Sequence, residues 1–264
     1  EFGISGVYID RSVPDIGWDR QYYNHIKPAG STTVTVMPHI GYVHDTSIWR
    51  SRVEPSNGAR WRVDLTGSPK ISVNNGESIE FATLSFDWRN YINYKKNYSL
   101  AFRFSGAVSE GTNPQRFYMG GVMNWFNPQW DNDQNTVLVD QIDDIYYSTF
   151  VTPMRGVGYY KKVGTRYLLA NTEFRFPFIR YLLMGWPLPI YMNNVRGAIF
   201  TDIGTAWKPE DLGNDGVPTD WIQGFGFGLR FDLGIFPLEW DIAWSKDSKM
   251  GMRPQYYFSI NAGF

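Results

Sequence analysis

Apolar and polar residues alternate with a period of two along much of this chain, most cleanly in residues 221–233. One face of that segment carries Phe225, Phe227, Leu229, Phe231 and Leu233, and the other carries Gly224, Gly226, Gly228, Arg230 and Asp232. A period of two is typical of a β-strand whose two sides meet different environments. The pattern therefore predicts an extended strand with one apolar and one small or charged face.

The same alternation, broken by linkers rich in Gly, Pro, Asn and Asp, predicts an all-β antiparallel protein. Strands are expected near residues 2–9, 33–44, 59–67, 80–92, 98–109, 115–122, 165–176, 195–207, 221–233, 237–245 and 254–264. The pattern thus predicts roughly eleven strands, an odd number, whereas a single-chain sheet that closes on itself as a membrane barrel normally has an even number. Either the count is wrong by one, or further strands precede Glu1, which is the interpretation we favour.

The last segment, PQYYFSINAGF, is the most informative one. Its apolar face consists of Tyr256, Phe258, Ile260, Ala262 and Phe264. An amphipathic strand that ends on an aromatic residue suits the closing strand of an outer-membrane β-barrel, since only closed barrels and helices satisfy every backbone group in lipid. The segment also looks like the carboxy-terminal signal for barrel insertion, which Tyr256, Phe258, Ile260 and Phe264 would carry. Expected partners are therefore outer-membrane lipid and the machinery that inserts barrels.

Composition agrees with a barrel. Aromatic residues make up 17% of the chain. A soluble β-sandwich could carry that many, but the interfacial girdles of a barrel use them in bulk. The mean hydropathy of −0.35 is expected if every second residue faces water. No segment predicts a transmembrane helix, since the most apolar stretch, residues 181–192, is too short and contains two prolines. Cysteine is absent, which excludes disulfides, and a net charge of −1 indicates no nucleic-acid partner.

Five motifs occur in an order that resembles a known family. They are FYMGG at 117–121, MRGVGY at 154–159, NTEFRFP at 171–177, FTDIG at 200–204 and GFGLR at 226–230. This order resembles the carboxy-terminal barrel of the Omp85 superfamily, also called the bacterial surface antigen D15 domain. In that family a Gly-Gly strand leads into a long loop with an Arg-Gly-aromatic motif, and five strands follow.

The resemblance is strong over residues 117–264 and weaker upstream, where residues 47–60, 87–91 and 109–114 look like a branch with a TolB-like β-propeller before the barrel. It implies that residues 1–264 form a carboxy-terminal barrel domain, with a lumen-folding loop at about 123–164. It also implies a periplasmic domain upstream and roughly five more strands, completing a barrel of about sixteen.

The resemblance further implies that the long loop folds into the lumen and that Arg155 meets Glu173 and Asp202. By alternation both carboxylates point inward, and a guanidinium can bind a carboxylate through two hydrogen bonds, which would form a specific structural latch. Gly156 would permit close approach of the backbone. The alternative is that Arg155 is a solvated loop charge. The family's usual small aliphatic and aromatic residues are replaced by Met154 and Val157, which weakens the analogy with the assembly factors.

Other motifs predict no catalytic, cofactor or metal site. The glycines at 224, 226 and 228 have the wrong spacing for a phosphate loop, and inward small residues that leave room for the loop explain them better. Residues 131–135 mimic the start of a calcium loop, but Thr136 and Ile142 occupy positions that require Gly and Glu. His25, His39 and His44 have no metal-binding spacing.

We therefore expect a non-enzymatic bacterial outer-membrane barrel that assists insertion or translocation of polypeptide clients. A weak seam between its first and last strands could template new β-pairing. The alternative is a structural anchor for a periplasmic propeller or a surface complex, without transport activity.

Overall fold

The computed structural model describes residues 1–11, 31–49, 54–70, 79–95, 97–130, 149–185, 190–213, 215–232, 237–248 and 251–260. These residues are predominantly β-structure, with one short 3₁₀ turn, η1 (Pro209–Asp211). In this part of the chain no helix is long and apolar enough to cross a membrane.

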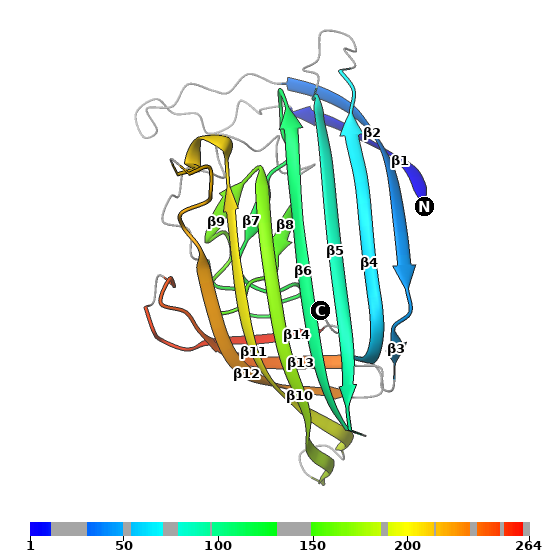
Figure 1. Cartoon of the computed structure of the whole chain (residues 1–264), viewed down its shortest axis with the longest axis vertical. Coiled ribbons are helices and arrows are strands. Elements are labelled where there is room, and N and C mark those ends of the chain that lie inside the picture. The colour runs from blue at the N-terminus through cyan, green and yellow to red at the C-terminus, as the bar shows by residue number, and fades with distance from the viewer. Residues whose placement is uncertain are drawn as a thin grey trace.

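A strongly curved antiparallel sheet forms the wall of the molecule (Figure 1). Its consecutive strands are β1 (Phe2–Arg11), β2 (Ser31–Asp45), β4 (Pro55–Ser68), β5 (Phe81–Tyr94), β6 (Tyr98–Gly111), β10 (Arg166–Met184), β11 (Ile190–Trp207), β12 (Ile222–Asp232), β13 (Pro237–Trp244) and β14 (Gln255–Ile260). The short β3 (Ile48–Trp49) pairs beside β4, which makes the sheet eleven-stranded. Among the described residues the order runs from β1 to β14 without closing.

The expected all-β antiparallel class is confirmed, but one expected wall strand is wrong. Residues 117–119 form β7 (Phe117–Met119), which lies in a separate sheet with β8 (Thr149–Thr152) and β9 (Lys162–Gly164). All three β7 side chains are buried, so β7 lacks the exposed face of a wall strand. Gly120 and Gly121 then turn the chain with positive φ angles. Because β6 pairs directly with β10, the described wall contains ten consecutive strands rather than eleven.

The two faces of the wall differ as the alternation predicts. On β12, Phe225 and Phe227 are about half exposed, whereas the intervening glycines are buried. On β14, Tyr256 and Phe258 are exposed, whereas Tyr257 and Ser259 are buried. A convex face of exposed large apolar side chains is the face that lipid covers in an outer-membrane barrel.

The two ends of the wall differ in the length of their connections. The β5–β6, β10–β11 and β12–β13 connections have three, five and four residues, whereas the β11–β12 and β13–β14 connections have 14 and ten. The β6–β10 connection, with 54 residues, is at the end with the long connections. Short turns are periplasmic and long loops extracellular in outer-membrane barrels, which orients the wall.

The outward face of β12 generates a stability prediction. Phe227 lies at the middle of this strand, so Phe227→Arg should lower the free energy of unfolding in phospholipid vesicles by about 2–4 kcal/mol. Gln223→Arg, near the strand end, is the matched control and should cost about 0–1 kcal/mol. Denaturant titrations of both variants would measure the difference, and equal costs would contradict a lipid-facing assignment.

Candidate functional site

Inward positions of four neighbouring strands form a charged patch on the inner face of the wall. The register places Asn171 of β10 opposite Asp202 of β11, and Gly228 of β12 opposite Asp241 of β13. Glu173 and Asp202 are fully buried, and Asp241 is 3% exposed. Because inward residues alternate on every strand, these carboxylates converge although they are far apart in the sequence.

Arg155 of the inner loop binds this patch. Its Nε and Nη2 donate to the two carboxylate oxygens of Asp202 at 2.7 and 2.8 Å, which is a bidentate ion pair. Its Nη1 donates to Glu173 at 3.0 Å and more weakly to Asp241 at 3.4 Å. The guanidinium also lies 3.4 Å from the centre of the Phe200 ring, a cation–π contact. Arg155 is 7% exposed, and each of its three guanidinium nitrogens donates to a carboxylate oxygen.

Two further arginines, Arg175 and Arg230, bind Glu173. Arg175 donates to Glu173 at 2.9 Å, and Arg230 donates to it at 3.3 Å while also binding Asp241. Arg175 continues the network to Glu54, whose carboxylate lies 3.2 Å away. A buried charge is strongly unfavourable unless it is paired and hydrogen-bonded, so this network is stable only with all its members in place.

Gly156 allows the loop to turn directly above the patch. Its φ is +96°, a left-handed conformation that glycine adopts without strain. A side chain there would also meet the carbonyl oxygen of Trp244 at 2.8 Å. Its amide donates to the Tyr257 hydroxyl at 2.8 Å, and that hydroxyl lies 2.9 Å from the Val157 carbonyl. The loop backbone is therefore fixed on both sides of Gly156.

The inward glycines of β12 make space for this loop. A Cβ atom built at Gly224 would lie 1.9 Å from the carbonyl oxygen of Arg155, which is far inside van der Waals contact. A Cβ at Gly226 would meet the Phe200 ring at 2.7 Å, and one at Gly228 would meet the Asp241 carboxylate at 1.7 Å. The absence of side chains therefore lets the loop, the aromatic ring and the carboxylate occupy one layer.

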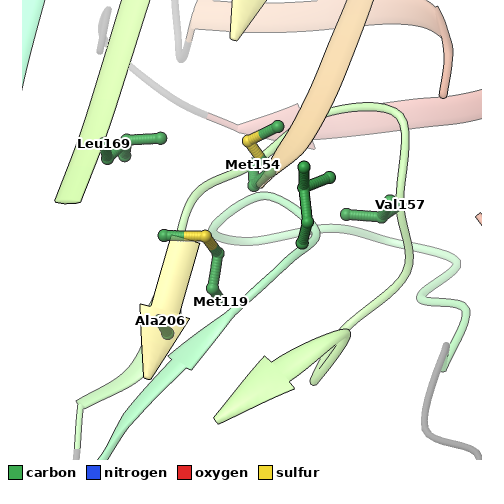
Figure 2. Packing of buried hydrophobic residues seen from close by; sticks show 6 residues of the cluster. Met119, Met154, Val157, Leu169 and Ala206 are labelled. Atoms are coloured by element: carbon green, nitrogen blue, oxygen red, sulfur yellow. The ribbon is translucent and has the colours of Figure 1, made fainter. Parts of the chain in front are cut away.

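The two residues that depart from the family motif lie in an apolar cluster beside the charges. Met154 and Val157 have no exposed surface and pack with Met119 and Leu169. Figure 2 shows these side chains converging with Ala206 from the loop and the wall. Ile222 completes the cluster. The loop is thus held by apolar burial as well as by ion pairs.

The start of the loop contacts the edge of β14 that pairs with no wall strand among the described residues. The side chains of Asn124 and Trp125 donate to the Ile260 and Tyr256 carbonyls at 3.0 and 3.1 Å, and the Phe126 amide donates to the Phe258 carbonyl at 2.9 Å. Trp125 packs inward on Tyr257, with ring centroids 4.5 Å apart. These three residues therefore cover the edge of the last described strand.

A half-buried tyrosine supports the same part of the loop. The Tyr159 hydroxyl donates to the Val122 carbonyl at 2.5 Å, and its ring packs against Trp125 and Trp130. Burial raises the pKa of Tyr159, and the phenol therefore remains a hydrogen-bond donor over the physiological range. This contact ties residues 122–130 to the segment that carries Arg155.

The structure brings Arg155, Gly156, Glu173 and Asp202 together at one place. Tyr256 and Phe258 lie on the outward side of β14 with Ile260, whereas Phe264 lies outside the described residues. Residues 131–136 and His25 also lie outside them. Within the described residues no group of three or more His, Cys, Asp or Glu side chains could hold a metal ion.

Sequence reasoning missed Arg175, Arg230 and Asp241 as partners of the loop arginine and its carboxylates. Each has the inward parity of its strand, so alternation could have marked it as lining the interior. Their convergence on Glu173 depends on the strand register, which the sequence does not show. Glu54, in the connection before β4, carried no sequence signal.

Comparison with known proteins identifies a family and a fold. The sequence profile of the "Omp85 superfamily domain" matches residues 37–264. The fold is similar to that of a solved structure, "The crystal structure of BamA from Haemophilus ducreyi lacking POTRA domains 1-3", with a TM-score of 0.54 and 14% identity. The match covers 88% of this chain and 43% of that one, so this chain spans less than half of that structure. A search of curated proteins finds no match.

The close contact at Gly224 generates a prediction about the loop. Gly224→Ala should displace the Arg155 backbone, because the added Cβ atom would overlap the Arg155 carbonyl oxygen. Overpacking typically costs about 1–3 kcal/mol of stability. Trypsin should then cut the loop at Lys161 or Lys162 about tenfold faster, as expected for a local opening that is more populated. Gly6→Ala, on a strand glycine with nothing within 4 Å, is the matched control and should leave cleavage unchanged. Equal cleavage rates in the two variants would contradict the packing argument.

Proposed function

Because this chain belongs to the Omp85 superfamily and is a bacterial outer-membrane protein, we propose that it assists the insertion of polypeptides into that membrane or their translocation across it. As a barrel of this family it has no enzymatic role. The observation that carries the proposal is the buried Arg155, which attaches an interior loop to the wall through three carboxylates. We assign Arg155, Gly156, Glu173 and Asp202 the role of a structural latch for this loop.

The latch keeps the loop docked on the wall through the ion pairs of one residue, Arg155. Removing Arg155 would leave Asp202 without its bidentate partner and Glu173 without one of three arginines. Releasing the loop would also expose the apolar surface around Met154. The loop therefore has a well-defined docked state, and client passage through the interior requires it to leave that state.

The docked loop also controls a strand edge. Asn124, Trp125 and Phe126 occupy alternate carbonyls of β14, the groups that a neighbouring strand would use. Movement of the loop would free this edge for pairing with another strand, since exposed edges template β-addition. In our proposal this edge is one side of the seam at which a client strand is added.

The remaining parts of the proposal concern assembly of the protein itself. The carboxy-terminal signal read by the barrel-assembly machinery consists of Tyr256, Phe258, Ile260 and Phe264. Residues 1–264 form the carboxy-terminal barrel domain, and a periplasmic domain precedes it. Since the described wall has ten consecutive strands, six further strands upstream would complete a barrel of about sixteen.

One observation favours a second function, that of an outer-membrane anchor for a periplasmic propeller or a surface complex. Met154 and Val157, which depart from the family motif, are completely buried and add apolar attachment to the ion pairs. A loop held in this way suits a permanently closed barrel. The two functions differ in whether release of the loop has any consequence for clients.

The test is Arg155→Ala in the full-length protein reconstituted in phospholipid vesicles. Breaking a buried ion pair typically costs about 3–5 kcal/mol, so trypsin cleavage of the loop should rise more than a hundredfold, up to the limit set by cleavage of the open loop. Insertion of an unfolded outer-membrane barrel into the same vesicles should change at least about tenfold, corresponding to 1.4 kcal/mol. Client insertion is followed by the appearance of protease-protected client.

Lys208→Ala is the matched control, because Lys208 is an exposed cation paired with the exposed carboxylate of Glu210 and lies outside the loop that trypsin cuts. Exposed ion pairs contribute only about 0–1 kcal/mol, so both readouts should stay near wild type. A loosened loop with unchanged client insertion would support the anchor function instead. A loop that remains protected in Arg155→Ala would overturn the latch.

A further inference from the structure

The β10–β11 hairpin continues past the strand that neighbours it on one side. β6 pairs with β10 only as far as Arg175, opposite Ser99, whereas β10 and β11 remain paired to Met184, opposite Ile190. Among the described residues, no strand pairs with the β6-facing edge of β10 from Phe176 to Met184. These nine residues form an edge of about 30 Å at the end of the wall with short turns. Figure 1 shows the hairpin projecting at this end.

This edge is apolar as well as unpaired. A β-bulge between Pro177 and Ile179 shifts the register, and it places Tyr181 and Leu183 on the outward side of the hairpin. Tyr181 is 68% exposed and Leu183 is 74% exposed. Both belong to residues 181–192, the most apolar stretch of the sequence.

Lipid cannot satisfy this surface. It could cover Tyr181 and Leu183, but the unpaired N–H and C=O groups of the β10 edge would then lack partners at a cost of several kcal/mol each. Water satisfies the backbone and leaves the apolar side chains exposed. An added β-strand satisfies both, because it supplies hydrogen bonds along the edge and apolar side chains at every second position.

We propose that this edge captures an extended segment of an outer-membrane client polypeptide by strand addition. The segment would lie in line with β6 and, like β6, antiparallel to β10. Client barrel strands have the required chemistry, since one face is apolar and the other small or polar. The inference deepens the proposed function, because it identifies where a client is held before it reaches the seam.

The experiment uses the full-length protein in lipid nanodiscs and the peptide QYYFSINAGF, which copies the chain's own last strand. Because residues 1–264 contain no cysteine, Leu183→Cys provides the single labelling site of this domain. A cysteine added to the end of the peptide should form a disulfide with it under mild oxidation. Val217→Cys, about half exposed at the opposite end of the wall, is the matched control and should form none.

A second variant tests affinity without a cross-link. Tyr181→Lys with Leu183→Lys should weaken binding of the fluorescent peptide at least about tenfold, since lysines protect a strand edge and remove two apolar cross-strand contacts. Val217→Lys with Met252→Lys replaces two exposed apolar residues elsewhere and should leave affinity unchanged. A heat-modifiability gel would establish that each variant is folded.

Three results would overturn the proposal. The first is equal affinity of the peptide for the two lysine variants. The second is equal cross-linking of a peptide whose alternation of apolar and polar residues has been scrambled. The third is contact of residue 183 with lipid in the absence of peptide, detected with brominated lipids. These results are independent of the Arg155→Ala insertion assay. Peptide capture with unchanged client insertion in Arg155→Ala would reject the latch mechanism and leave this edge as a strand-binding site.

Discussion

The structure depends on the requirement that a buried arginine be completely paired. Arg155 lies in the interior of the wall, and its guanidinium is held by Asp202, Glu173 and Asp241, with Phe200 against its face. A partly paired charge in this environment would cost several kcal/mol. The registers of β10 to β13 must therefore agree with one another, because a slip of one residue on any of these strands would turn its charged residues to the outside.

The small residues of β12 follow from the same requirement. Gly224 lies opposite Asp202 and directly below the Arg155 carbonyl, so the loop approaches the sheet at a distance that a side chain would prevent. Gly156 supplies the left-handed turn that directs the loop toward Tyr257. Charge pairing, backbone approach and apolar packing thus act on one short segment, and the docked loop is a single state that can be gained or lost as a unit.

The edges of β14 and β10 differ in whether another segment covers them. The edge of β14 is occupied by the loop, which makes its availability dependent on the latch. Within the described residues, the β10 edge beyond Arg175 has no strand beside it and carries exposed apolar side chains. Natural sheets usually protect edges of this length, so an apolar edge left open is most simply explained by a partner strand.

The sequence by itself determined the all-β class and the outward and inward faces of most strands, because a period of two is a local property. Arg155, Glu173 and Asp202 were indicated by the resemblance to the family motifs, and alternation added only that both carboxylates point inward. The sequence could not show that residues 117–119 leave the wall, since three buried neighbours look like a strand until their surroundings are known. Only the tertiary structure decided that Arg175, Arg230 and Asp241 join the patch and that β10 extends past β6. Those facts depend on strand register and length, which arise from contacts between residues far apart in the chain.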